Sequence, residues 1–317
     1  MLNYDYLDAY IKKVYLPQFV DQILGSNPTT LRFFGKAKER RGGSPIMVNL
    51  SIVKNTSGGS YGKWDSENLV FYDTKTQAEF TWKYNRKFIV LSHIDELENA
   101  GDGKVIDLID SEIETAKQSF KDDLGIQFFG DGTGNNSLDI TGLKAAIDDG
   151  TVVDTYAGIK RTDYSWWKSR YDYNSGVDRA LTVALMQRMM GLCSGGVDSS
   201  DKPTLIVTTQ NLFDKYASLM DVTRDRGESE LARAGFSVLY FAGIPITVDS
   251  HCPEKYMYFI NENHMWMYVH PDENFTYVPF AYKIDQEVMV AKIRLACQLI
   301  QNECRKSGVI RCLDYTL

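Results

Sequence analysis

Two stretches of alternating apolar and polar residues dominate the first third of the chain. They run from Ile46 to Ile52 and from Val70 to Val90, and a period of two is the signature of extended strands. In the second stretch the even positions are largely apolar and the odd positions are mostly polar. Residues 55–63 between them are rich in Gly and Ser and have no apolar period, which is typical of a turn. The pattern predicts one long hairpin.

The predicted hairpin is too long for the body that should carry it. At about 3.3 Å per residue its second strand would span about 70 Å, whereas a compact chain of this length has a radius of gyration of about 20 Å. A two-stranded ribbon is marginally stable in water and leaves its edges unpaired. We therefore expect the hairpin to protrude and another molecule to cover its apolar face. The expected assembly residues are Trp64, Phe80, Trp82 and Tyr84.

The rest of the chain has the periodicities of a mixed protein. Apolar residues at helical spacing predict a long helix over residues 103–125 and shorter helices near 7–19, 177–192 and 212–220. Short apolar or alternating runs predict strands at 204–208, 236–241, 244–249, 255–260, 264–269 and 275–280. A long closing strand is expected over 287–300, and a last one near 311–317.

Composition and charge exclude several classes of protein. The net charge of −7 argues against a protein that binds nucleic acid by neutralising phosphates, and we interpret the one short basic run, Lys36 to Arg41, as a solvated stretch. No apolar segment is long enough to span a bilayer, and a secretory signal is not evident, so we expect a chain made and kept in a cytoplasm. The five cysteines have no metal-ligand spacing and are expected to be reduced.

Several apparent chemical motifs have simpler structural interpretations. Residues 130–134 contain three glycines, as a phosphate loop does. A phosphate loop opens a helix, however, whereas these residues are expected to end one. Residues 131–139 alternate oxygen-bearing side chains but lack the closing Glu of a calcium loop. Ser165 and Lys168 fit the S-x-x-K pattern of serine acyl-enzymes without its companion motifs. The histidines, including His251, His264 and His270, have no metal-binding spacing. We expect no enzyme, no cofactor and no metal, with a serine hydrolase as the alternative from another class.

The order of the predicted elements resembles the major capsid proteins of tailed bacteriophages, which share the Hong Kong 97 fold. The turn after the long helix and the following Gly142-Leu143 resemble a G-D-G turn and G-L pair of that family. Residues 158–161 and 241–253 are similar to its G-x-x-R stretch and to its G-x-P strand with a D-x-x-x-P turn. The residues that match these motifs are Gly132, Arg161, Trp166, Gly243, Pro245, Asp249 and Arg294.

The resemblance implies an α+β fold in four parts. These are an N-terminal arm (1–44), an extended β-hairpin loop (45–95), a peripheral domain (96–179 and 281–317) with a spine helix at 103–125, and an axial α/β domain (180–280).

The resemblance also implies a function and a location. Copies of the chain would form the hexamers and pentamers of an icosahedral capsid around double-stranded DNA, assembled in the bacterial host cytoplasm and found in the virion. The partners would be the chain itself, portal and scaffolding proteins and possible decoration proteins, with weak non-specific contact to packaged DNA and no contact with a membrane. Within the same fold the alternative is an encapsulin shell around an enzyme cargo. A monomeric binding protein conflicts with an uncovered hairpin.

Overall fold

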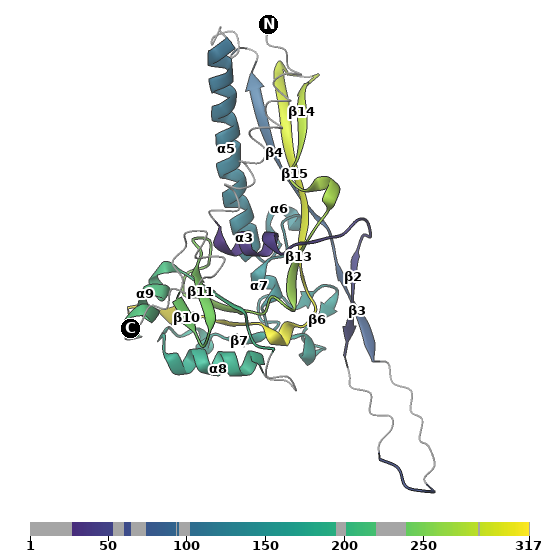
Figure 1. Cartoon of the computed structure of the whole chain (residues 1–317), viewed down its shortest axis with the longest axis vertical. Coiled ribbons are helices and arrows are strands. Elements are labelled where there is room, and N and C mark those ends of the chain that lie inside the picture. The colour runs from purple at the N-terminus through teal and green to yellow at the C-terminus, as the bar shows by residue number, and fades with distance from the viewer. Residues whose placement is uncertain are drawn as a thin grey trace.

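The computed structural model describes most of the chain. It covers residues 27–52, 60–64, 74–92, 94, 102–194, 201–219, 239–284 and 286–316, and for residues 102–110 it describes the backbone alone. The helix predicted near residues 7–19 lies outside these ranges. Figure 1 shows an elongated molecule, in which a long helix lies along strands at one end, a mixed body follows and a two-stranded hairpin projects at the other end.

The long helix α5, Asp102–Phe129, confirms the predicted spine helix and continues past Gly125. Buried side chains recur on it at three- and four-residue spacing and therefore share one face; they are Ile113, Ala116, Phe120, Leu124 and Phe128. At 1.5 Å per residue its 28 residues span about 42 Å. The helix is long enough to support one side of a sheet.

A five-stranded sheet packs beside α5, built around the long strand β15, Val288–Gln301. Three strands pair with β15 in antiparallel fashion, namely β4 (Lys83–Ser92), β13 (Met265–Val269) and β14 (Thr276–Tyr282). The short strand β1, Lys38–Glu39, pairs with β13 in parallel. Cys297 of β15 is fully buried, and burial raises the pKa of its thiol to about 12. It is a core side chain, as the strand pattern predicts.

The predicted second arm of the hairpin consists of two strands in two different sheets. Strand β3, Lys75–Phe80, pairs with β2, Ile46–Ser51, whereas β4 pairs with β15. Thr81 and Trp82 separate the two strands and shift the alternation by one position. In β4, Ile89 and Leu91 are buried, whereas the even-numbered aromatic and apolar residues are exposed: Tyr84, Phe88 and Val90. The prediction of one continuous strand from 70 to 90 is therefore wrong.

The inward side chains of β4 meet polar groups on α5. Asn85 and Gln127 exchange two side-chain hydrogen bonds of 3.0 and 3.1 Å, and the Lys87 ammonium lies 2.5 Å from the Asp123 carboxylate. These pairs satisfy polar groups on the covered side of the strand. Asn85 and Lys87 are therefore polar because they bind the helix, and not because they face water.

A six-stranded sheet forms the body of the molecule, in the order β10-β11-β9-β12-β16-β7. Its strands are β7 (Arg170–Asp172), β9 (Leu205–Thr208), β10 (Leu239–Phe241), β11 (Ile244–Val248), β12 (Met257–Ile260) and β16 (Gly308–Ile310). Helices α8, Val183–Ser194, and α9, Gln210–Leu219, form a second core with Ile206 of β9, while Leu205 and Val207 point to the main core. The predicted strand-to-helix unit at 204–220 is confirmed.

The sheets do not follow the predicted division into parts. Strand β13 and most of β14 fall within residues 180–280, yet both pair with β15. Helix α8 begins later than predicted because residues before it include β8, Arg179–Ala180, which pairs with β17, Leu313–Asp314. The remaining short elements are α6 (Gly134–Ser137), α7 (Leu143–Ala146), β5 (Thr155–Tyr156), β6 (Ile159–Lys160), η2 (Ser165–Trp167), η3 (Asn174–Gly176), η4 (Pro271–Glu273) and η5 (Cys304–Lys306).

Helix α3, Pro28–Gly35, was not predicted from the sequence pattern. Pro28 stands in the first turn, where a missing N–H costs nothing, and Phe33 is buried with its ring 5.1 Å from that of Phe128. The helix thereby fastens the start of the described chain to the spine helix. Among the described residues, no helix has the length and apolar character needed to cross a membrane.

Candidate assembly surfaces

The base of the hairpin belongs to the core of this subunit. Strands β2 and β3 pair from Ile46 opposite Phe80 to Ser51 opposite Lys75. Phe80 is 3% exposed, and its ring packs against the Tyr156 ring in a T-shaped arrangement with the centroids 5.5 Å apart. The body of the same chain thus covers the apolar face at this point, and the role of Phe80 in assembly stays a prediction.

Trp82 is also a core residue. Its side chain is 5% exposed, its ring stands edge-on to His270 at 5.7 Å, and its indole N–H donates a hydrogen bond of 3.0 Å to the Gly43 carbonyl oxygen. The ring is packed and the indole N–H is hydrogen-bonded within the subunit, so the side chain exposes little surface for contact with a neighbouring subunit. Trp82 is therefore buried within the subunit, and its role in assembly stays a prediction.

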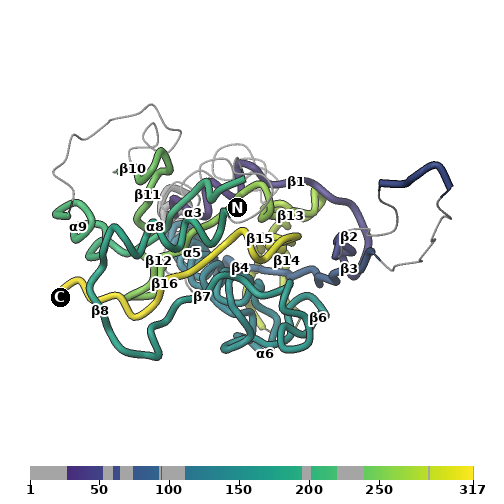
Figure 2. The backbone as a smooth tube through the Cα atoms, turned by 90° about the horizontal axis from the view of Figure 1, so that it is seen from below, coloured from purple at the N-terminus to yellow at the C-terminus, as the bar shows by residue number. Residues whose placement is uncertain are grey.

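The described tip of the hairpin carries two bare aromatic rings. Tyr61 is 89% exposed and Trp64 is 88% exposed, and the Lys63 ammonium lies 5.4 Å from the Trp64 ring centroid. Figures 1 and 2 both show residues 60–64 far from the body, at the end of the projection. The structure thus places Trp64 as an assembly surface requires, and it adds Tyr61.

A second exposed apolar surface lies on the side of β4 that faces away from α5. Tyr84 is 69% exposed, Phe88 47% and Val90 44%, and the Arg86 guanidinium lies 5.2 Å from the Phe88 ring centroid. We call these four residues the β4 face. Tyr84 is exposed there, as its predicted assembly role requires, but Phe88 and Val90 belong to this surface only because the alternation shifts at Trp82.

Arg294 of β15 lies directly opposite Arg86 in the strand pairing. Its guanidinium lies 2.9 Å from the Glu273 carboxylate, and 41% of its side chain is exposed. The predicted family-motif arginine therefore borders the β4 face, where it is paired with Glu273.

Arg161 organises the region after the spine helix from a fully buried position. Its guanidinium donates hydrogen bonds to the carbonyl oxygens of Ala146 (2.9 Å), Val153 (3.0 Å) and Trp167 (3.2 Å). The buried Asp148 carboxylate lies 3.8 Å away. A buried charge is tolerated when it is hydrogen-bonded and paired in this way. The predicted motif residue is structural, with no path to solvent for chemistry.

The tryptophan pair beside Arg161 divides into a core residue and a surface residue. Trp167 is 1% exposed and donates its indole N–H to the Tyr156 carbonyl oxygen at 3.0 Å. Trp166, the predicted family-motif residue, is half-buried and lines a cavity of about 350 Å³ beside the end of β2. The deep core position thus belongs to Trp167 and not to Trp166.

Two predicted glycines stand where the backbone requires them. Gly132 has φ +81°, and a Cβ there would lie 2.9 Å from the Cα of Thr141. Ala242 and Gly243 both have positive φ, of 49° and 79°, and they form the two-residue turn between β10 and β11, as a type I′ hairpin demands. Pro245 follows in β11, opposite Tyr240.

Asp249 connects α3, α5 and the body. It is 1% exposed, and its carboxylate accepts a hydrogen bond of 3.0 Å from the backbone N–H of His251 and one of 3.4 Å from that of Thr29, near the start of α3. The His251 ring sits against Gly125 of α5, where an added Cβ would approach it to 2.5 Å. A hydrogen bond to Asp249 raises the pKa of His251, although burial alone would lower it.

The serine-hydrolase pair does not come together through its side chains in the described residues. Ser165 is exposed on η2, and its contact with Lys168 is a backbone hydrogen bond of 3.4 Å. A nucleophile needs a base within hydrogen-bond reach of its hydroxyl. The hydrolase alternative thus has no geometric support here.

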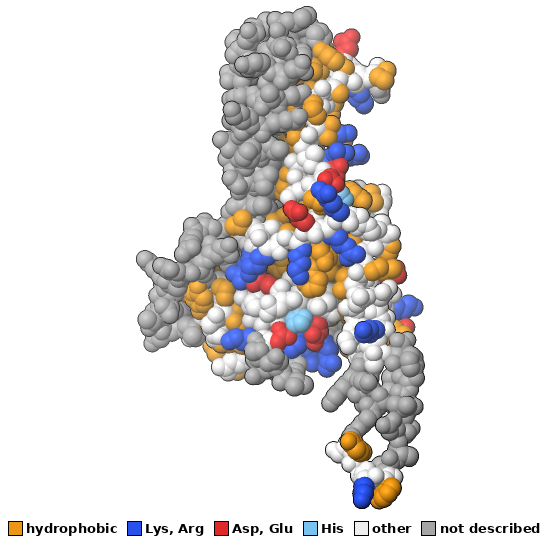
Figure 3. Space-filling view, turned by 45° about the vertical axis from the view of Figure 1, so that its right-hand side comes forward, with side chains coloured by type: hydrophobic (Ala, Val, Ile, Leu, Met, Phe, Trp, Pro, Cys, Tyr) orange, Lys and Arg blue, Asp and Glu red, His pale blue; other side chains and the backbone are white. Residues whose placement is uncertain are grey.

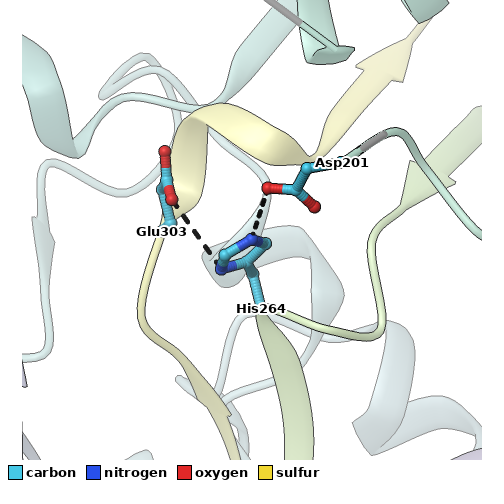
Figure 4. Close-up of side chains that lie close together, drawn as sticks. All are labelled: Asp201, His264 and Glu303. Carbon is cyan, nitrogen blue, oxygen red and sulfur yellow. Dashed lines mark hydrogen bonds and ion pairs between the residues drawn. The ribbon is translucent and has the colours of Figure 1, made fainter. Parts of the chain in front are cut away.

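A charged cluster joins three connections of the chain (Figure 4). Asp201 precedes β9, His264 lies between β12 and β13, and Glu303 follows β15. His264 Nε2 lies 2.7 Å from the Asp201 carboxylate, and its Nδ1 lies 3.7 Å from that of Glu303. The sequence placed no two of these residues near each other, because they come from widely separated segments.

The cluster has the donor spacing of a metal site but carries its own cation. Donor atoms of Asp201, His264 and Glu303 lie within 4.8 Å of one another. The largely buried Lys306 ammonium lies 3.1 Å from Asp201, and Asn261 donates to Asp201 at 2.6 Å. Burial alone would raise the pKa of Asp201, but the hydrogen bonds from Asn261, His264 and Lys306 outweigh it and lower the pKa. We interpret the cluster as a salt bridge between the two sheets.

Comparison with solved structures identifies the architecture. The capsid asymmetric unit of cyanophage A-1(L) matches with a TM-score of 0.67 at 18% identity, over 88% of this chain and 90% of that chain. The chain has the fold of a capsid subunit. A structure from Mycobacterium phage Patience gives 0.57 at 11% identity, over 95% and 87% of the two chains. No family model and no curated protein matches the sequence.

The capsid fold also occurs in a shell of another kind. The holo-SrpI encapsulin complex from Synechococcus elongatus PCC 7942 matches with a TM-score of 0.56 at 10% identity, over 90% of this chain and 89% of that chain. The predicted α+β capsid fold is confirmed. A phage shell and an encapsulin shell differ in their contents and not in this fold.

Proposed function

We propose that this chain is the structural subunit of an icosahedral viral capsid, in which copies form hexamers and pentamers around double-stranded DNA. The observation that carries the proposal is the projecting hairpin, whose tip exposes nearly the whole of Tyr61 and Trp64. Bare aromatic rings on a thin projection are costly in water and are typical anchors in protein interfaces. The match to a phage capsid subunit over about nine-tenths of both chains supports the same conclusion.

The two exposed apolar surfaces suit contacts between unlike faces. Figure 1 shows the hairpin tip and the upper part of β4 at opposite ends of the long axis. A subunit that inserts its tip into one neighbour and receives the tip of another forms a head-to-tail contact, which gives a ring when the rotation between copies closes. We infer that the tip of one copy docks near the β4 face of the next, where Trp64 can stack on Phe88 or on Arg86. Portal, scaffolding and decoration proteins remain expected partners of such a shell.

The test is assembly itself, measured by sedimentation and negative-stain electron microscopy of the purified chain. The parent should form closed shells or five- and six-fold rings. Tyr61→Ser/Trp64→Ser should abolish them while the subunit keeps its denaturation midpoint, because both rings are already in water. Deleting residues 55–64 should act in the same way. A matched control, Tyr164→Ser, removes a half-exposed ring on the body and should assemble as the parent does.

Two outcomes would contradict the proposal. A parent chain that stays monomeric at high concentration, with and without its neighbouring gene products, would refute the shell function. Normal assembly of the tip variant would refute the role of the hairpin tip.

An encapsulin shell is the second candidate, and the match to the encapsulin complex favours keeping it. Shells purified from the native source separate the two candidates by their contents. Nuclease-protected double-stranded DNA supports the capsid, and a co-purifying enzyme without DNA supports the encapsulin.

A further inference from the structure

We propose that the groove between α3 and β13 binds the phosphodiester backbone of double-stranded DNA, so that this surface faces the interior of the shell. The groove has a volume of about 300 Å³ and is lined by residues of α3, β1 and the start of β13. Figure 3 shows a band of Lys and Arg side chains across the middle of this face. The inference deepens the proposed function, on which it rests, by naming the surface that meets the packaged DNA.

The cations at the groove come from the basic run that the sequence suggested was merely solvated. Lys36 follows α3 directly, and β1 then lies in extended form along the edge of β13. Because extended residues alternate, Lys38 and Arg40 share one side. Lys38 lies 3.9 Å from the centroid of the Trp266 ring, and the Arg40 guanidinium lies 5.7 Å from that of Tyr268. The run is therefore an ordered row of charges seated on aromatic rings.

The carboxylate at the floor of the groove is already neutralised. Glu262 accepts two bonds of 2.6 Å from Arg32, one of 2.8 Å from the Thr204 hydroxyl, and longer ones from Lys36. Burial alone would raise the pKa of Glu262, but these partners lower it. The carboxylate is therefore ionised, and the charge of Arg32 balances it. Lys36, whose side chain is half exposed, and Lys38 keep positive charge facing outwards.

The pattern fits a phosphate chain better than a single small anion. The cations follow one another at two-residue spacing, so the site is a stripe and not a closed pocket. Double-stranded DNA presents about one charge per 1.7 Å of axis, and each cation that neutralises a phosphate releases counterions. Rows of Lys and Arg beside aromatic residues are the expected footprint of such binding. The chain has a net charge of −7, so the rest of its surface repels DNA. A local basic stripe would therefore turn this face of the subunit toward the DNA.

The test is the salt dependence of DNA binding, measured by fluorescence anisotropy of a random-sequence duplex with the full-length chain. Each neutralised phosphate contributes about 0.9 to the slope of log K against log salt. The variant Lys36→Gln/Lys38→Gln should therefore lower the magnitude of the slope by about 1.8. Lys36→Arg/Lys38→Arg should retain the parent's slope, since the charges remain. The control, Lys75→Gln/Lys160→Gln, removes two exposed lysines elsewhere and should also retain it.

The outcomes separate this inference from the proposed function. Equal slope losses in the groove variant and the control, or a parent slope near zero, would overturn the groove as a DNA site even if electron microscopy shows normal shells. Equal affinity for poly-glutamate and for DNA at the same salt concentration would overturn the assignment to a phosphodiester chain. A slope loss confined to the groove variant supports the site, and assembly is scored separately on the same preparations.

Discussion

Replacing each of two tryptophans in the hairpin segment should separate folding from assembly. Trp82→Ala removes a ring that is 5% exposed and an N–H that donates to the Gly43 carbonyl oxygen at 3.0 Å. Trp64→Ala removes a ring that is 88% exposed. Both changes delete the same atoms from the same region of the sequence, so any difference between them comes from the environment of each ring.

The expected magnitudes follow from that environment. Truncating a buried tryptophan costs about 3–5 kcal/mol through lost transfer free energy and the cavity left behind, and the carbonyl oxygen deprived of its donor adds about 1 kcal/mol. Trp82→Ala should therefore lower the free energy of unfolding by about 4–6 kcal/mol, a large share of the roughly 5–15 kcal/mol of a folded domain. Trp82→Phe keeps the ring packing in part and should lose about 1–2 kcal/mol. Trp64→Ala should change stability by less than about 0.5 kcal/mol.

The assay is urea unfolding of dissociated subunits followed by circular dichroism, beside sedimentation of assembling preparations. We expect Trp82→Ala to unfold first, and any folded fraction of Trp82→Phe to assemble. Trp64→Ala should fold normally and fail to assemble. A loss of less than about 1 kcal/mol for Trp82→Ala, or equal losses for the two alanine variants, would refute the burial argument.

Three further expectations rest on other contacts. Arg161→Lys should cost about 3 kcal/mol in unfolding free energy, because a lysine cannot reproduce the fork that bonds three carbonyl oxygens; a parental urea midpoint would contradict this. Gly125→Ala should cost about 1–3 kcal/mol by overlap with the His251 ring, and His251→Ala should rescue it, whereas additive losses would count against the overlap. Because the folded-state pKa of His251 is raised by Asp249, its stabilisation is complete below about pH 6.5 and disappears as pH rises through the folded pKa. The stability advantage of the parent over His251→Asn should therefore shrink with rising pH, and a constant difference would exclude this linkage.

Local periodicity was sufficient for much of the fold. The spacing of apolar residues predicted α5, the unit formed by β9 and α9, and the strands from β10 to β15, because helices and strands repeat with different periods. The two residues left between the predicted strands 236–241 and 244–249 form the turn between β10 and β11, in which Ala242 and Gly243 both have positive φ. Helix α3 was missed because it is short and its buried contacts are made by separated residues instead of a long periodic face.

The candidate assembly surfaces were predicted from the sequence less well than the helices and strands. The alternating pattern before β4 correctly predicted strands, but Thr81 and Trp82 shift the register, and a shift of one residue exchanges the two faces of a strand. Phe80 and Trp82 thereby became core residues, and Phe88 and Val90 became surface residues. The cluster of Asp201, His264 and Glu303 and the groove at Lys38 both depend on strand pairing between distant segments, for which the sequence carries no local signal.

The sequence by itself indicated most of the helices and strands, two extended arms with a Gly-rich segment between them, and a resemblance to capsid proteins along nearly the whole chain. Tertiary structure alone decided which strand pairs with which and, through that, whether a given aromatic ring packs in the core or is left for a neighbour. The physical reason is that periodicity depends on nearest neighbours along the backbone, whereas burial depends on packing between segments far apart in the chain.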